Sequence, residues 1–114
     1  MERSLELRQV ECPVTLAQHI LAGKWKLVLV WRLKDGAMRF GELQRSIPGI
    51  KQSSLTQQLR ELERDGVVHR EIFKQIPPKV EYSLTDIGNA LIKVLYAFGA
   101  WGVDYKKSCL NSDS

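Results

Sequence analysis

The sequence predicts a mainly α-helical domain with a small β-wing, an α+β fold of the winged helix-turn-helix type. Three features support this fold class: a helix with a leucine stripe at residues 51–66, a shorter apolar helix that ends just before it, and a β-hairpin pattern just after it. At 114 residues the chain has the common size of one domain with a single hydrophobic core.

The composition narrows the class of protein. Apolar residues make up 44% and charged residues 26% of the chain, as in soluble globular proteins, and the net charge of +4 modestly favours a polyanionic partner. The longest apolar run, Leu27 to Trp31, is too short to span a bilayer, and no secretory signal opens the chain. Two cysteines far apart make no disulfide framework, so we expect a cytoplasmic protein with no membrane association.

Residues 1–11 form a charged arm of alternating Glu and Arg, for which two alternatives stay open: disorder, or packing over a partner subunit. Pro13 suits the first turn of a helix that runs from Cys12 to Leu21, with Gly23 as its C-cap. The apolar residues of this helix occupy a wide arc, which indicates contacts beyond one neighbour; they are Val14, Leu16, Ala17, Ile20 and Leu21.

Lys24 to Asp35 is expected to be the central helix, because its residues leave almost no polar face. The β-branched run also fits a buried strand, but its length and the stop at Gly36 favour a helix. The segment from Lys24 to Arg45 carries the whole net positive charge of the chain. These charges are either solvated helix ends or a phosphate-facing flank.

A helix-turn-helix is expected next, from Phe40 through the turn at Pro48-Gly49 to a helix over residues 52–65. Its leucines at 55, 59 and 62 line one side, and the polar residues on the other suit base edges and phosphates: Ser53, Gln57, Arg60 and Arg64, with Thr56 beside them. The second helix is therefore the candidate reader of the DNA major groove. A merely solvated face is the alternative, since Glu61, Glu63 and Asp65 cancel the local charge.

Residues 67–84 predict a β-hairpin, the wing. β-Formers fill 67–75, residues 80–84 alternate apolar and polar side chains, and the stiff tip Ile76-Pro77-Pro78-Lys79 separates them. Arg70, Lys74 and Lys79 are placed on or near the tip, where they can reach a phosphate or the minor groove. Most charged hairpin tips are only solvated, so these residues gain their weight from their position after a helix-turn-helix.

Thr85-Asp86 supplies an N-cap and a first-turn acid for a terminal helix of about twenty residues. This helix is too apolar for a small core to absorb, so we expect a dimer interface; folding back over its own core is the alternative. With the first helix, the expected interface comprises Val14, Ala17, Leu21, Leu91, Leu95, Phe98, Trp101 and Tyr105. The domain is set at residues 12–107 and a flexible tail at 108–114.

The chain resembles the HxlR-type winged helix-turn-helix regulators of bacteria and archaea, relatives of the MarR-like repressors. The resemblance extends from Cys12 to Trp101 and lies in Cys12-Pro13-Val14, Gly23-Lys24-Trp25, residues 39–43 (RFGEL), 47–50 (IPGI), 55–62 (LTQQLREL), Pro77-Pro78 and 80–85 (VEYSLT). It implies a homodimeric repressor whose two reading helices enter successive major grooves of an inverted-repeat operator. Lys51 departs from the pattern, so Ser53 or Ser54 is expected to cap the reading helix, the latter in a capping box with Gln57.

Cys12 is a candidate redox sensor, because some family members sense oxidants through a cysteine near this position. A helix N-terminus lowers the pKa of a thiol, although Glu11 opposes this. The alternative is a small buried residue that packs the N-terminal arm, since free cysteine is commonly buried.

The function predicted is a sequence-specific DNA-binding transcriptional regulator without cofactors; the alternative is a winged-helix module that binds protein. An enzyme is disfavoured because His19 and His69 are isolated, and neither metal-ligand spacing nor a Gly-rich phosphate loop occurs. The expected contacts to double-stranded DNA are Arg39, Lys51, Gln52, Ser53, Thr56, Gln57, Arg60, Arg64, Arg70, Lys74 and Lys79.

Overall fold

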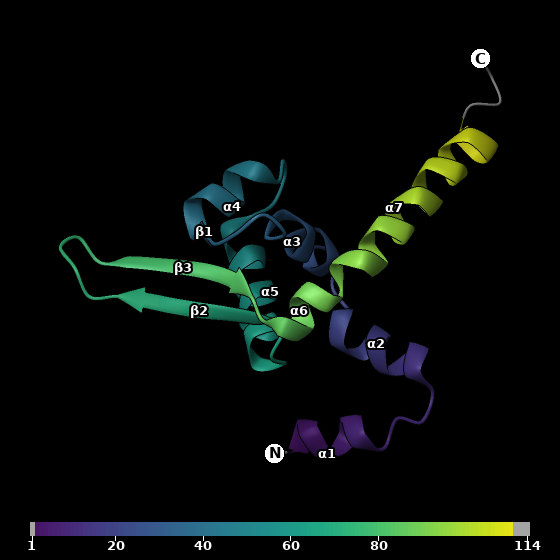
Figure 1. The fold of residues 1–114 in the computed structure, drawn as a ribbon, viewed down its shortest axis with the longest axis horizontal. Coiled ribbons are helices and arrows are strands. Elements are labelled where there is room, and N and C mark those ends of the chain that lie inside the picture. The colour runs from purple at the N-terminus through teal and green to yellow at the C-terminus, as the bar shows by residue number, and fades with distance from the viewer. Residues whose placement is uncertain (1, 111–114) are drawn as a thin grey trace.

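A computed structural model describes residues 2–110 as a helical body with a β-hairpin on one side and the terminal helices on the other (Figure 1). The elements in chain order are α1 (Glu2–Arg8), α2 (Pro13–Leu21), α3 (Lys26–Arg32), β1 (Met38–Arg39), α4 (Phe40–Ser46), α5 (Gln52–Arg64), β2 (Val68–Phe73), β3 (Lys79–Leu84), α6 (Asp86–Ala90), α7 (Ile92–Tyr105) and the π-helical turn η1 (Lys106–Leu110). The predicted fold class is confirmed.

The hydrophobic core lies where α3, α4 and α5 meet the base of the hairpin and the start of α7. Its buried residues are Leu29, Val30, Leu33, Leu43, Ile47, Ile50, Leu55, Leu59, Leu62, Val67, Val68 and Leu95. The leucine stripe of α5 is fully inside this core, as its helical spacing predicts. Burial of this stripe fixes which face of α5 points outward.

The helix-turn-helix is formed by α4 and α5. The backbone N–H of Arg39 donates to Oε1 of Glu42 at 2.7 Å, which helps to cap the start of α4. The turn between the helices uses Gly49 at a φ of +88°, a backbone conformation that favours glycine. The predicted capping box of α5 is wrong: Lys51 is the N-cap residue, and no side chain caps the helix.

The hairpin belongs to a three-stranded antiparallel sheet in the order β1-β3-β2. Val68 pairs with Leu84 at its base and Phe73 with Lys79 near its tip, so the hairpin loop is residues 74–78. The predicted tip at 76–79 is therefore shifted, because Lys79 already belongs to β3. The short strand β1 was not predicted, because two residues carry no periodic signal; Met38 pairs with Tyr82. It joins α4 directly to the wing.

The N-terminal half departs from the sequence-based expectations in three places. Residues 2–8 of the expected arm are helical, which argues against disorder there. Helix α2 ends at Leu21 with Ala22, not Gly23, as its C-cap. The central helix is shorter than predicted, at Lys26–Arg32, and Val28 on it is 37% exposed, so other helices do not surround it fully. The alternative of a buried strand is wrong.

The C-terminal helix is broken and projects from the body (Figure 1). Thr85 caps α6 by accepting a hydrogen bond from the backbone N–H of Gly88 at 3.2 Å, as predicted. Leu91 separates α6 from α7, which leads away from the core, so the helix does not fold back over its own domain. The expected tail begins later than residue 108, because η1 continues the helical path to Leu110. Residues 111–114 of that tail lie outside the described part of the chain.

Candidate nucleic-acid interface

The face of α5 opposite its buried leucines is polar and accessible. Leu55, Leu59 and Leu62 are at most 2% exposed, so the helix is held firmly from behind. The exposed or half-buried side chains on the remaining surface of α5 include Gln52, Ser53, Thr56, Gln57, Arg60 and Arg64, with Lys51 at the N-cap. This surface offers amides, hydroxyls and guanidinium groups, the donors and acceptors that pair with base edges in a major groove.

Two acidic side chains on the flanks of α5 form ion pairs with basic side chains from other elements. Nζ of Lys26 lies 2.7 Å from Oε1 of Glu61, whose other oxygen accepts from Nε2 of Gln57 at 3.1 Å. On the other flank, Nε of Arg70 lies 3.4 Å from Oε2 of Glu63. The hydrogen bond from Lys26 is the main cause that lowers the pKa of Glu61, with Gln57 adding to it. The negative charges of Glu61 and Glu63 are therefore partly neutralised by ion pairs within the domain.

A third acid, Asp65, is bound by two arginines. Its oxygens lie 2.6 Å from Nε of Arg3 and 3.1 Å from Nη2 of Arg64, and its side chain is 2% exposed. Burial would raise the pKa of Asp65, but hydrogen bonds from both arginines outweigh burial and hold the pKa at about 2. Arg64 is thus turned toward Asp65. Arg60, by contrast, has no ion pair within residues 2–110, so the cancellation of charge expected from the sequence does not reach it.

A hollow of about 460 Å³ opens between α5 and the wing. Its lining combines an apolar floor with polar residues from both elements: Phe40, Gln52, Thr56, Leu59, Arg60, Glu63, Arg70, Val80 and Tyr82. A second, more open hollow of about 890 Å³ lies over α5 and is lined by Gln52, Ser53, Thr56, Gln57, Arg60 and Glu61. Gln52, Thr56 and Arg60 border both, so they are the centre of the candidate surface.

The basic residues of the wing lie both at its loop end and in the middle of the hairpin. Lys74 is exposed in the hairpin loop, and Nζ of Lys79 lies 3.6 Å from Glu81 and 4.5 Å from the ring centroid of Phe73. Arg70 was expected on or near the tip; it instead pairs with Tyr82 in the middle of the hairpin and reaches back to α5. Arg39, exposed in β1, is carried at the opposite edge of the same sheet.

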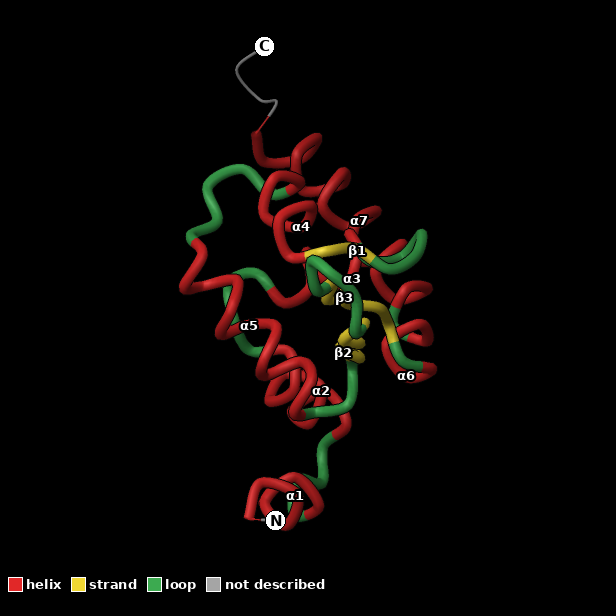
Figure 2. Tube along the Cα trace, turned by 90° about the vertical axis from the view of Figure 1, so that its left-hand side faces the viewer, coloured by secondary structure: helices red, strands yellow, loops and turns green. Residues whose placement is uncertain are grey.

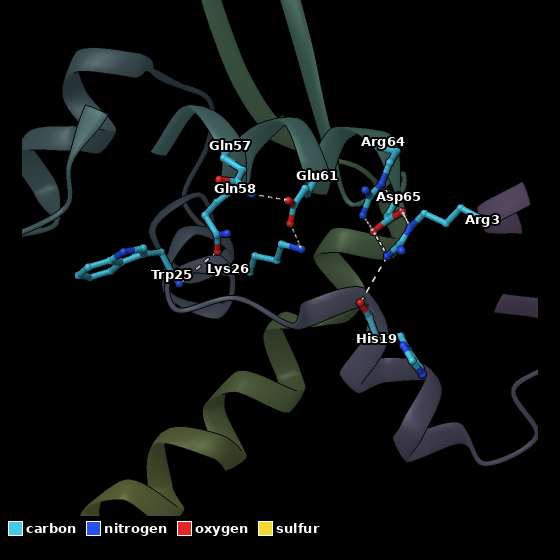
Figure 3. Close-up of polar contacts among 9 residues, drawn as sticks. All are labelled: Arg3, His19, Trp25, Lys26, Gln57, Gln58, Glu61, Arg64 and Asp65. Carbon is cyan, nitrogen blue, oxygen red and sulfur yellow. Dashed lines mark hydrogen bonds and ion pairs between the residues drawn. The ribbon is translucent and has the colours of Figure 1, made fainter. Parts of the chain in front are cut away.

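Lys26 was expected at a solvated helix end or on a phosphate-facing flank, and both readings are wrong. Its side chain is 2% exposed and lies beneath α5 (Figure 3). Sequence reasoning missed its partnership with Glu61. The available signal was a lysine next to an apolar run, which alone does not identify the acid it meets.

The terminal helices leave large apolar side chains uncovered. Exposed fractions are 77% for Val14, 56% for Phe98, 64% for Trp101 and 45% for Tyr105, while Ala17 is exposed and Leu21 and Leu91 are half-buried. Leu95 is different: it is 6% exposed and belongs to the core of its own chain. A groove of about 380 Å³ runs between α2 and α6–α7 and is lined by Pro13, Leu16, Ala17, Ile20, Leu21, Val67, Ile87, Ala90, Leu91 and Val94.

Cys12 is exposed at the N-cap of α2, so the expectation of a small buried residue is wrong. The nearby Thr15 hydroxyl, and then the backbone N–H groups of Thr15 and Val14, lower the pKa of the Cys12 thiol. Cys109, in η1, is exposed as well. The arrangement at Cys12 favours the thiolate, the reactive form of a cysteine.

Across the described residues, no group of three or more His, Cys, Asp or Glu side chains could hold a metal ion. No helix within residues 2–110 is both long enough and apolar enough to cross a bilayer.

Comparison with known proteins identifies the relatives of this chain. A family model described as HxlR-like helix-turn-helix matches residues 20–109. The uncharacterized HTH-type transcriptional regulator YdeP of Bacillus subtilis (strain 168) is 54% identical over 95 residues, which cover 83% of this chain and 74% of YdeP. An uncharacterized HTH-type transcriptional regulator of Methanothermobacter thermautotrophicus is 45% identical over 101 residues, which cover 89% of this chain and 77% of the relative. The redox regulator HypR in its reduced form superposes with a TM-score of 0.79 at 46% identity, over 89% of this chain and 99% of HypR.

Proposed function

The chain belongs to the HxlR-like helix-turn-helix family and is a DNA-binding transcriptional regulator rather than an enzyme, and from this premise we propose that it acts as a homodimer that represses transcription from an inverted-repeat operator. Helix α5 enters the major groove, and the wing of residues 67–84 contacts backbone phosphates or the adjacent minor groove. A dimer bound over a promoter would exclude the polymerase. The proposed location is the cytoplasm, where the chromosome of a bacterium or archaeon lies.

The single observation that carries the proposal is the exposed polar face of α5 opposite its buried leucine stripe. Side chains that contact bases specifically need a rigid backbone, and the buried leucines of α5 hold this helix in place. Arg60 is the strongest candidate for a specific contact, because arginine pairs bidentately with guanine and this one has no ion pair within residues 2–110. Lys74 and Lys79 on the wing are proposed phosphate contacts, which add affinity without sequence information.

The dimer is proposed from the terminal helices. Phe98, Trp101 and Tyr105 leave a run of exposed aromatic rings along α7, two of which stack at a centroid distance of 5.5 Å. Exposed apolar surface of this extent commonly marks an interface. A two-fold axis through it would place two α5 helices on half-sites about one helical turn, or roughly 34–36 Å, apart. The interface proposed is Val14, Ala17, Leu21, Leu91, Phe98, Trp101 and Tyr105; the core position of Leu95 removes it from the set.

A second proposal concerns Cys12 as the sensor of an oxidant. The exposed thiol and its lowered pKa favour reaction with electrophiles and oxidants. HypR, which this chain resembles over most of its length, is named a redox regulator. In this proposal, oxidation of the Cys12 thiol changes the arrangement of α2 in the dimer and thereby the affinity for the operator.

The main proposal is tested by enriching duplexes from a random-sequence library on the purified protein and footprinting the enriched sequence. An inverted repeat with half-sites about ten base pairs apart is expected. If no sequence is enriched and binding to random duplexes is undetectable at low salt, the chain is a protein-interaction module rather than a reader of operators.

A further inference from the structure

The side chain of Lys26 is buried, with 2% of its surface exposed. Lysine is almost never buried to this degree unless it is paired. Its partner is Glu61, on the flank of α5 that adjoins the groove-facing surface, and the Nζ to Oε1 distance is 2.7 Å (Figure 3). A buried ion pair is weak evidence for stability, so a role in specifying one arrangement has to be considered.

The second oxygen of Glu61 connects this pair to the candidate DNA-reading surface. Oε2 accepts a hydrogen bond from Nε2 of Gln57 at 3.1 Å, one helical turn earlier on α5. A carboxylate only accepts hydrogen bonds, and the hydrogen bond from Lys26 lowers the pKa of Glu61. Gln57 must therefore turn its nitrogen toward Glu61. Its Oε1 and its second N–H remain free as one acceptor and one donor, the pattern that pairs with N6 and N7 of adenine.

The start of α3 holds the same flank of α5 at a second point. The backbone N–H of Trp25 donates to Oε1 of Gln58 at 3.3 Å. Gly23 makes room for this contact, because a Cβ on Gly23 would lie 2.3 Å from that oxygen. Residues 23–26 thus contact α5 at two points beside Gln57. These contacts fix the position of Lys26, from which the hydrogen bonds run to Glu61 and on to Gln57.

We propose that Lys26 and Glu61 are positioning residues that preset the Gln57 carboxamide for reading one base pair, with adenine as the preferred base. The inference rests on the proposed function, since it requires α5 to lie in the major groove. A side chain that is already oriented loses less conformational freedom on binding. The fixed orientation also penalises bases that need the opposite arrangement of donor and acceptor.

The experiment uses the operator enriched from the random library and all of its single-base-pair variants, with dissociation constants measured for each protein. Gln57→Ala should lose about five- to 150-fold discrimination at one base pair and its symmetry mate. Lys26→Met should lose roughly three- to tenfold at that same base pair. Its affinity for random duplexes should stay within about twofold, because phosphate contacts are untouched. Lys24→Met is the matched control: this lysine is exposed, two residues away, and should not alter discrimination.

A second variant keeps the inference testable if Lys26→Met does not fold, as judged by circular dichroism. Glu61→Gln retains an oxygen for Lys26 but offers Gln57 either an oxygen or a nitrogen. The carboxamide of Gln57 is then no longer held in one orientation, so the preference for adenine at the same base pair should fall. This change of preference at a single position is one that a purely structural role would not produce.

Three results would overturn the inference. The first is folded Lys26→Met or Glu61→Gln protein with unchanged discrimination at the base pair that Gln57→Ala affects. The second is an equal loss of discrimination at every position, which would make the pair merely structural. The third is a Gln57→Ala variant with unchanged discrimination at every base pair although Arg60→Ala changes it. That result would exclude Gln57 as a reader but would still support α5 as the reading helix. Failure of both Gln57→Ala and Arg60→Ala to alter binding would overturn the proposed function itself.

Discussion

Arg3 in α1 and Asp65 at the C-cap of α5 form an ion pair, with Nε and Oδ1 2.6 Å apart. The same guanidinium donates to the backbone oxygen of His19 in α2 at 3.4 Å. One arginine therefore links α1, α2 and the end of α5. Figure 2 shows why such a link matters, because α1 lies at the margin of the fold, apart from the sheet. The proposed dimer helices and the reading helix are thus connected within one chain.

The Arg3–Asp65 pair should contribute to stability in a pH-dependent way. Folding lowers the pKa of Asp65 from 3.8 to about 2, so its contribution is complete above about pH 4 and is lost as the pH falls toward 2. A shift of this size corresponds to roughly 2 kcal/mol. Asp65→Asn should therefore lower the free energy of unfolding at pH 7 and flatten its decline between pH 4 and pH 2, as measured by urea titration at fixed protein concentration.

Arg3→Ala separates the contribution of the pair from that of Arg64. We expect a loss of about 1 kcal/mol at pH 7, because Arg3 is partly exposed and Arg64 still binds Asp65. Arg8→Ala is the control, since Arg8 is exposed in the same helix. Equal stabilities of the two variants across the pH range would mean that the Arg3 contact is not maintained in solution.

The elements with a clear period were predictable from the sequence. The leucines of α5 mark which side of that helix is buried, because a soluble domain must cover its apolar residues. The alternation in β3 located the strand but not a buried side, since all six of its residues are half-buried. The turn at Gly49 and the cap at Thr85 depend on neighbouring residues and were equally accessible. Local chemistry was sufficient for these elements.

Features that depend on contacts between distant residues were not predictable. Lys26 and Glu61 are thirty-five positions apart, so neither sequence neighbourhood reveals that they neutralise each other. The apolar stripe of the last helix is continuous in sequence, yet Leu95 packs into the core and Phe98, one turn later, is 56% exposed. A stripe identifies an apolar face but not the point at which the helix leaves the domain.

The dimer prediction follows from this distinction. Replacing Phe98 and Trp101 together with Glu should produce monomers that keep their fold, because both side chains are more than half exposed in the single chain. Sedimentation equilibrium measures the mass and circular dichroism the helix content. Leu95→Glu is unsuitable, since a charge in the core would unfold the domain. Lys93→Glu, an exposed position of the same helix, should remain dimeric. Dimers of the double variant would place the interface elsewhere.

Cys12 should react faster with thiol reagents than an ordinary cysteine. Its pKa is lowered chiefly by the Thr15 hydroxyl, so more thiolate is present at neutral pH. In a Cys109→Ser background, Thr15→Ala should raise this pKa and shift the pH profile of iodoacetamide alkylation toward alkaline values. Gln18→Ala, an exposed change later in α2, is the control. Superimposable profiles for the Thr15→Ala and parent proteins would show that this hydroxyl does not activate the thiol.

The redox role needs a separate measurement on DNA. Diamide joins two thiols in a disulfide and is itself reduced to the hydrazine. A disulfide between Cys12 and a second cysteine of the dimer should therefore weaken operator binding by the parent protein. Cys12→Ser should bind with the same affinity before and after treatment. A parallel loss of binding by Cys12→Ser would return the effect to Cys109 or to another oxidised group.

Specificity and affinity should be divided between α5 and the wing. Arg60→Ala removes a proposed base contact, so it should cost about 1–3 kcal/mol on the operator and leave binding to random duplexes nearly unchanged. Lys74→Ala removes a proposed phosphate contact from the exposed loop, so it should weaken all duplexes alike and reduce the slope of log affinity against log salt by about one per site. In a symmetric dimer each loss counts twice.

Glu71→Ala serves as the control for the wing. Glu71 is exposed in β2 and pairs with His69, not with one of the lysines or arginines proposed to contact DNA. Removal of this acid should leave the salt slope unchanged or make it slightly steeper. Arg70→Ala should differ from Lys74→Ala, since Arg70 is held by Glu63 and sits over the hollow beside Arg60. Loss of Arg70 leaves the Glu63 carboxylate without its partner, so Glu63 can repel phosphate. The affinity should therefore fall by more than the loss of one phosphate contact, as counted from the salt slope, would explain. If Arg60→Ala and Lys74→Ala gave the same ratio of operator to random binding, the division between reading helix and wing would be wrong.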